Sequence, residues 1–233
     1  MAQIERILAE PAVMWPPGSG AIAETRSNFN SFTNVGFKVV EETRIIDLRL
    51  WDPKDATKSV VQYFRGARVL KESEENDIFF VKLMASGDVQ VRFPSQKLRA
   101  TLVKTPDIPG PNGTKICSWG VTYDFSHVPQ GHIESISAFD ESPGVDLQRD
   151  TIGDSHLGFE ILTDTAELAM WILMPKDRAY NSWTVTRVLN EVPERVEQVE
   201  PIQDYRSADS TIMGFQLASV KRGERYEVSW SYR

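Results

Sequence analysis

Residues 114–139 read TKICSWGVTYDFSHVPQGHIESISAF and contain the clearest strand and turn signals in the chain. Every second position is apolar until the series ends in an imidazole: Cys117, Trp119, Val121, Tyr123, Phe125 and His127. Strict alternation over this length is typical of a half-buried strand. The tetrad Val128-Pro129-Gln130-Gly131 follows, and proline with glycine favours a tight turn. The stretch therefore predicts a β-hairpin that turns at residues 128–131.

This hairpin suggests a metal site. With a four-residue loop, His127 and His132 would lie opposite each other with Cβ atoms about 5 Å apart. Glu134 would share their face two residues further along. Two imidazoles and a carboxylate suit a divalent transition metal with open coordination positions, as in a cupin-like barrel. The alternative is that the histidines only flank a loop and contact each other or solvent. Apart from such a metal, no cofactor is expected.

Alternating or apolar runs between turn residues recur along most of the chain. Besides the two arms of the hairpin, the expected strands are 35–51, 60–70, 78–84, 89–93, 98–104, 157–162, 167–174, 183–189, 211–220 and 225–233. Residues 2–10 predict a short N-terminal helix that ends at Pro11. Many short strands with few helical windows are typical of sandwiches and barrels, so the predicted fold class is all-β.

The domain organisation has two readings. Five prolines and glycines crowd into residues 105–115, which is the composition of a linker or a long crossover. The first reading has a helix and connector over 1–20, a sandwich-like domain over 21–105 and a second over 115–233. The second reading is one large two-sheet sandwich.

Two C-terminal segments give sharper expectations. Residues 168–174, LAMWILM, are apolar on both faces, as in a central strand covered on each side. Residues 225–233 alternate aromatic and apolar side chains with polar ones, which predicts one solvated face. Together with 211–220 and the turn at 221–224, they predict a terminal hairpin. Trp171→Ala is expected to cost more stability than Trp230→Ala.

The distribution of charge, apolar residues and cysteine limits the partners and the cellular location that we expect. The net charge of −7 is uneven, because residues 1–110 carry 15 Lys and Arg against 14 Asp and Glu, whereas residues 111–233 carry 11 against 19. An acidic second half disfavours nucleic acid as a partner. No apolar run is long enough to span a membrane, the N-terminus lacks the apolar core of a signal peptide, and a single cysteine fits a reducing compartment. A cytoplasmic location is therefore expected.

Two further residues, Cys117 and Trp15, are candidate sites. Cys117 shares its expected face with Trp119 and Val121, and an apolar setting favours a core thiol over a nucleophile. Trp15 lies beside Pro16-Pro17 in the connector, so it must pack back on the body or bind a partner.

The function expected from these patterns is a non-catalytic interaction or recognition module with a protein partner, alone or within a larger assembly or oligomer. A cupin-like metal-dependent enzyme or sensor that uses residues 127–134 is one alternative. Carbohydrate or small-ligand binding is another. An enzyme is not favoured, because the chain has neither a nucleotide-binding loop nor a nucleophile elbow.

Overall fold

The computed structural model describes residues 34–51, 60–85, 89–93, 97–104, 108–109, 115–142, 154–175, 180–189, 192–195, 201–206 and 210–232. The strands are β1 (Phe37–Asp47), β2 (Val61–Lys71), β3 (Ile78–Ala85), β4 (Gln90–Arg92), β5 (Ala100–Lys104), β6 (Ile108–Pro109), β7 (Lys115–Asp124), β8 (Ile133–Ser142), β9 (Asp154–Glu160), β10 (Thr165–Pro175), β11 (Tyr180–Leu189), β12 (Val192–Arg195), β13 (Pro201–Arg206), β14 (Ser210–Val220) and β15 (Arg225–Tyr232). The all-β prediction is confirmed for these ranges, in which every regular element is a strand. The predicted helix over 2–10 and Trp15 lie outside the described residues.

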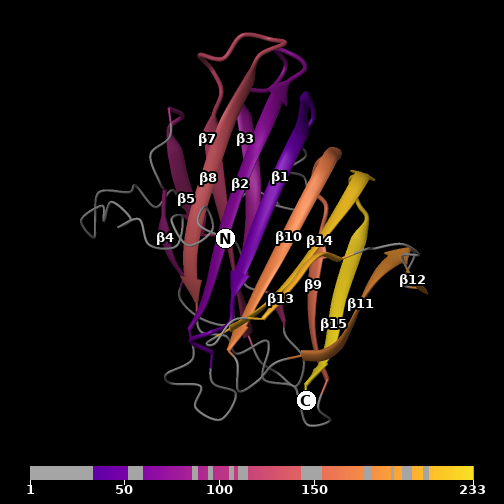
Figure 1. Ribbon diagram of the computed structural model, residues 1–233. Helices are drawn as coiled ribbons and strands as arrows, with labels where there is room; N and C mark the ends of the chain where they lie inside the picture. The colour runs from indigo at the N-terminus through magenta and orange to yellow at the C-terminus, as the bar shows by residue number, and fades with distance from the viewer. Residues whose placement is uncertain are drawn as a thin grey trace.

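The strands form one large sheet and two smaller ones (Figure 1). The seven-stranded sheet has the order β13-β14-β10-β1-β2-β8-β4. A four-stranded sheet of strands from the C-terminal half of the chain has the order β12-β11-β15-β9. The third sheet is β3-β7-β5, with β6 added on β7. The pairing of β1 with β10 is parallel and brings strands from the two halves of the chain together at the centre of the large sheet.

One face of the seven-stranded sheet packs against both smaller sheets. On its β10 and β14 side, Leu168, Met170 and Phe215 pack with Val228 and Trp230 of β15. On its β1, β2 and β8 side, a second set of buried apolar residues packs with β3 and β7: Phe37, Val39, Val69, Ile136, Phe79, Val81, Val121 and Tyr123. The alternation of apolar residues in each strand supplies these faces, so burial of the core follows the period-two pattern.

The hairpin prediction for residues 114–139 is wrong. Strand β7 pairs with β3, β5 and β6, whereas β8 pairs with β2 and β4. Residues 125–132 therefore carry the chain from one sheet to the other instead of joining two paired strands. The apolar face of β7 is buried as expected, but it packs across the interior against the large sheet.

The prediction of a terminal hairpin from residues 211–220 and 225–233 is also wrong, because these two strands belong to different sheets. Strand β14 pairs with β10 and β13 in the seven-stranded sheet, whereas β15 pairs with β11 and β9. The turn at 221–224 is present, since the amide of Glu224 donates to the carbonyl of Lys221 and Gly223 has φ 86°. A tight turn therefore fixes a reversal of the chain but not which strand it pairs with.

Strands that precede residues 105–115 in the sequence pair with strands that follow them. Strand β5, before this segment, pairs with β7 after it, and β2 pairs with β8. The seven-stranded sheet takes β1, β2 and β4 from one side of the segment and β8, β10, β13 and β14 from the other. Each of these two sheets therefore takes strands from both sides of residues 105–115.

The predicted central position of β10 is confirmed, but its tryptophan is less buried than that of β15. Strand β10 is central, between β1 and β14, as its composition predicts. Trp171 of β10 is only partly buried, however, whereas Trp230 of β15 is 2% exposed in the core. None of the described segments forms a helix long and apolar enough to cross a membrane.

Candidate functional site

The structure does not bring the three expected metal ligands together. His127 and His132 are exposed residues of the 125–132 loop, whereas Glu134 lies in β8 opposite Val69 of β2. His132 Nδ1 lies 3.4 Å from the carbonyl oxygen of Gln130. No group of three or more His, Cys, Asp or Glu side chains suited to a metal ion occurs among the described residues. The hairpin geometry that motivated the metal site is absent, because this loop crosses between sheets.

The same loop belongs to another arrangement, at the end of the molecule that lies uppermost in Figure 1. Three connections meet there: residues 34–36 before β1, residues 72–77 between β2 and β3, and residues 125–132 between β7 and β8. We call this surface the Lys71 end. Two of the three connections cross from the seven-stranded sheet to the β3-β7-β5 sheet or back.

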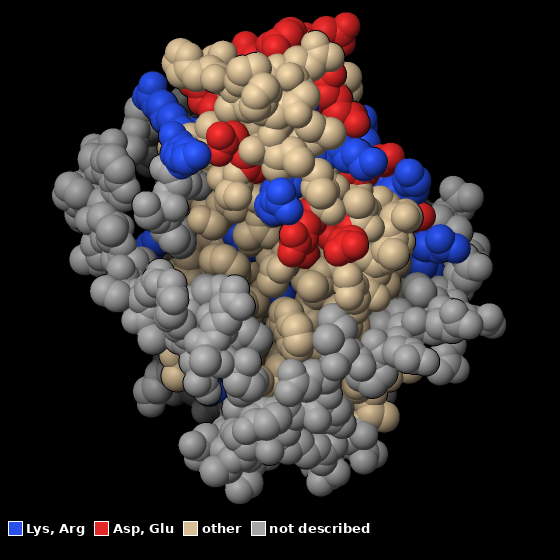
Figure 2. All heavy atoms as spheres, turned by 45° about the horizontal axis from the view of Figure 1, so that its top comes forward, with Lys and Arg blue, Asp and Glu red and all other residues tan. Residues whose placement is uncertain are grey.

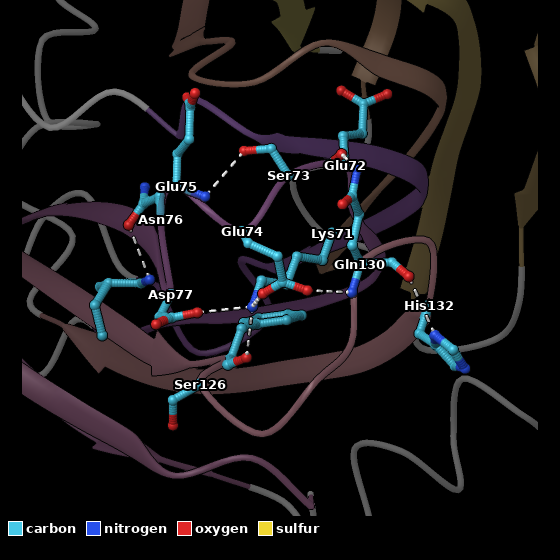
Figure 3. Close-up of polar contacts among 12 residues, drawn as sticks. Lys71, Glu72, Ser73, Glu74, Glu75, Asn76, Asp77, Ser126, Gln130 and His132 are labelled. Carbon is cyan, nitrogen blue, oxygen red and sulfur yellow. Dashed lines mark hydrogen bonds and ion pairs between the residues drawn. The ribbon is translucent and has the colours of Figure 1, made fainter.

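Lys71 is the residue around which these connections are arranged (Figure 3). Its side chain is 0% exposed. The Nζ atom lies 2.7 Å from Asp77 Oδ1 and 2.8 Å from Glu74 Oε2, and it also donates to the carbonyl oxygen of Phe125 at 3.3 Å. A buried ammonium requires such partners, because an unpaired charge in the interior is strongly destabilising.

The backbone joins the 72–77 and 125–132 loops around Lys71. The amide of Gly131 donates to the carbonyl of Lys71, and the amide of Lys71 donates to the carbonyl of His132. Gln130 adds two contacts, from its amide to Glu74 Oε1 at 2.7 Å and from its side chain to the carbonyl of Glu72 at 2.7 Å. The two loops therefore form one hydrogen-bonded unit (Figure 3).

The 34–36 connection is attached to the same unit. The amides of Glu72 and Ser73 both donate to the carbonyl of Gly36. Gly36 has φ +84°, and a Cβ atom there would lie 2.7 Å from Ser73 Oγ, so the position requires glycine. Asn34 is buried and exchanges hydrogen bonds with the backbone of Phe80 while donating to Thr163 Oγ1.

The charges at this end stabilise each other. Hydrogen bonds from the ammonium to Asp77 and Glu74 raise the pKa of Lys71, because they outweigh the effect of burial. The Lys71 ammonium and the Gln130 amide lower the pKa of Glu74. Both shifts favour the charged forms of Lys71 and Glu74, so this ion pair is formed at neutral pH.

The outer surface of the Lys71 end combines apolar and acidic side chains. Val35, Ile78 and Ile133 are exposed large hydrophobic residues next to its three connections. Residues 72–77 carry four acidic side chains and no basic one. Figure 2 brings this end forward and shows acidic side chains beside uncharged surface. Exposed apolar residues bordered by charge are typical of a surface that contacts another macromolecule.

The importance of Lys71 was missed at the level of sequence, although a signal was present. Lys71 continues the parity of Val61, Ala67 and Val69, which face the interior. Four carboxylates follow it within six residues. A lysine in phase with a buried face and followed closely by acids indicates a buried, paired ammonium.

The chain matches no known family model, and no curated protein sequence is similar to it.

Proposed function

We propose that the protein is a non-catalytic interaction module that binds a protein partner through the Lys71 end, alone or as part of a larger assembly. The observation that carries this proposal is the fully buried Lys71, which ties the loops from two sheets into one rigid surface. Loops that are already ordered lose little conformational entropy on binding, so their contacts contribute more to affinity.

The chemistry of this surface supports a particular kind of partner. Glu72 and Glu75 are exposed, and Val35, Ile78 and Ile133 provide apolar contact area. A protein surface with basic side chains around an apolar centre would complement both features. The net charge of −7 supports a protein rather than a nucleic acid as this partner. A cytoplasmic location is part of the proposal and is supported by the single cysteine.

Site-specific photo-crosslinking in the native host tests this proposal. A photoreactive residue replaces Glu75 in one variant of the full chain and Leu50 in a second variant. Leu50 is a matched control, because it is exposed and follows the opposite end of β1. A discrete crosslinked species at position 75 that is absent at position 50 is expected. The species should also disappear when Ile133→Ser is added. Equal crosslinking at both positions, or none at position 75, would contradict the proposal.

A further inference from the structure

A second group of charged residues lies on the inner face of the seven-stranded sheet. Arg44 of β1 and Arg65 of β2 are directly opposite each other in the antiparallel pair. Glu42 precedes Arg44 by two residues and is buried on the same face. Like charges in directly opposed positions destabilise a sheet, so this pair requires negative charge nearby.

Glu42 supplies only part of that charge. The Nε atoms of Arg44 and Arg65 each lie 2.6 Å from the same oxygen, Glu42 Oε1. Burial alone would raise the pKa of Glu42, but the two guanidinium groups outweigh it and lower this pKa to about 2. Glu42 is therefore ionised, and the three residues together carry a charge of about +1.

The terminal amino groups of both arginines point to a ligand. Within the described ranges, the Nη atoms of the two guanidinium groups make no hydrogen bond, and the closest contact of each group to Glu42 is through Nε. The Arg44 and Arg65 side chains are 15% and 19% exposed, so neither is fully enclosed. The Arg44 guanidinium also lies 5.1 Å from the centre of the Phe159 ring, which fixes its orientation. Two oriented guanidinium forks favour bidentate hydrogen bonds to an oxyanion.

Asp140, another acid of this face, does not take that role. Asp140 of β8 is buried diagonally across from Arg65, and no ion pair joins the two among the described residues. Burial raises the pKa of Asp140 to about 7, and the charge of Arg65 offsets only part of this effect. Arg65 of β2 and Tyr123 of β7 are the titratable groups whose interaction with Asp140 is evident. Below neutral pH, Asp140 is largely protonated and leaves the positive charge of the arginines in place.

We propose that Arg44 and Arg65 form a binding site for an oxyanion, the carboxylate or phosphate group of a small molecule, on the inner face of the seven-stranded sheet. Glu42 holds the two guanidinium groups side by side through Nε and leaves their Nη atoms for the ligand. This site is separate from the Lys71 end and does not depend on the function proposed for that surface.

Calorimetric titration of the full chain at low ionic strength tests the site, with inorganic phosphate in one arm and acetate in the other. Saturable binding of one equivalent in at least one arm is expected, and the arms distinguish the two ligand chemistries. Arg44→Gln should weaken this binding at least tenfold. Arg92→Gln is the matched control and should leave it unchanged, because Arg92 also has an acidic and an aromatic neighbour, Glu141 and Phe139.

Two further variants separate binding from folding. Arg44→Lys keeps the charge but not the fork, so it should retain the melting temperature and bind more weakly than the wild type. Asp140→Asn should bind more tightly than the wild type at pH 8, where the wild-type carboxylate competes for the arginines. Absence of saturable binding in both arms would overturn the proposal, as would equal affinities of the Arg44→Gln and Arg92→Gln variants.

Discussion

At the scale of single residues, Lys71 is set apart by the burial of its charged group, whereas Lys38, Lys97 and Lys221 are exposed. Its ammonium is enclosed, whereas the carboxylates that pair with it, Glu74 and Asp77, are themselves largely exposed. Burial in the interior therefore orders the Lys71 side chain, and the ion pairs with Lys71 order the side chains of Glu74 and Asp77. Removing the lysine would release both loops, whereas removing one acid would leave the other in place.

Lys71→Met is expected to lower the melting temperature by several degrees and to reduce hydrogen-exchange protection of the Gly131 amide, which bonds to the carbonyl of Lys71. The raised pKa of Lys71 means that its contribution to stability is complete below the unfolded pKa and is lost as pH rises through the folded pKa. Lys38→Met, at an exposed position of β1, is the control and should change neither measurement. Similar effects in both variants would show that Lys71 does not order the loops.

Asp140 gives a second prediction at this scale. Its folded pKa of about 7 lies above the value for an unfolded chain, so its ionisation destabilises the fold. Stability from this group is greatest below about pH 4, falls as pH rises toward 7, and stays low above that. Asp140→Asn should therefore raise the free energy of unfolding by a few kcal/mol at pH 8 and change it little at pH 4. Denaturant unfolding at the two pH values measures this difference, and equal effects at both would contradict it.

At the scale of elements, the position of a strand in its sheet did not decide how deeply its tryptophan is buried. Strand β10 is central, but Trp171 lies on the face of the sheet opposite the main core, beside Ile45 and Leu173. Its ring covers Gly214 of β14, where a Cβ atom would lie 2.5 Å from the ring. Trp230 faces the main core from a smaller sheet. The layer that a side chain faces therefore matters more than the number of strands around it.

This difference reverses the expected order of two substitutions. Trp230→Ala should lower the free energy of unfolding by about 3–5 kcal/mol, because it leaves a cavity in the main core. Trp171→Ala should cost less, because part of that ring is already exposed. Denaturant unfolding of the two variants, with unchanged m-values, gives the comparison. A larger loss in Trp171→Ala would indicate that the outer face is the more tightly packed one.

At the scale of the whole molecule, most connections between consecutive strands move the chain from one sheet to another. Among consecutive described strands, only β1 with β2, β6 with β7, β11 with β12, and β13 with β14 are paired neighbours. The two apolar clusters both use the seven-stranded sheet as one wall. Loss of that sheet would therefore expose both clusters together.

Thermal unfolding is accordingly expected to be a single cooperative transition. Far-UV circular dichroism, tryptophan fluorescence and calorimetry should give coincident midpoints, with a calorimetric enthalpy equal to the van't Hoff enthalpy. Two independent sandwich domains divided at 105–115 would instead give two transitions. Resolved transitions would restore the two-domain reading, in spite of the shared sheet.

Local sequence determined where strands form and which of their faces is buried. The alternation in β15 predicts Tyr226, Val228 and Trp230 in the core, and all three are buried. The alternation in β7, continued to the residue after it, predicts the burial of Val121, Tyr123 and Phe125, which is also observed. These features follow from sequence because the period of a strand is local and alternate side chains must point to opposite faces.

Tertiary structure alone decided the strand partners and therefore the candidate sites. The turns at 128–131 and 221–224 reverse the chain, but each leads into a different sheet, since pairing depends on contacts with residues far away in sequence. That choice separates His127 and His132 from the paired positions expected for them. It also places the 125–132 loop against Lys71, and Arg44 beside Arg65. Period-two patterns specify a buried face, whereas the packing of one sheet on another specifies what that face contacts.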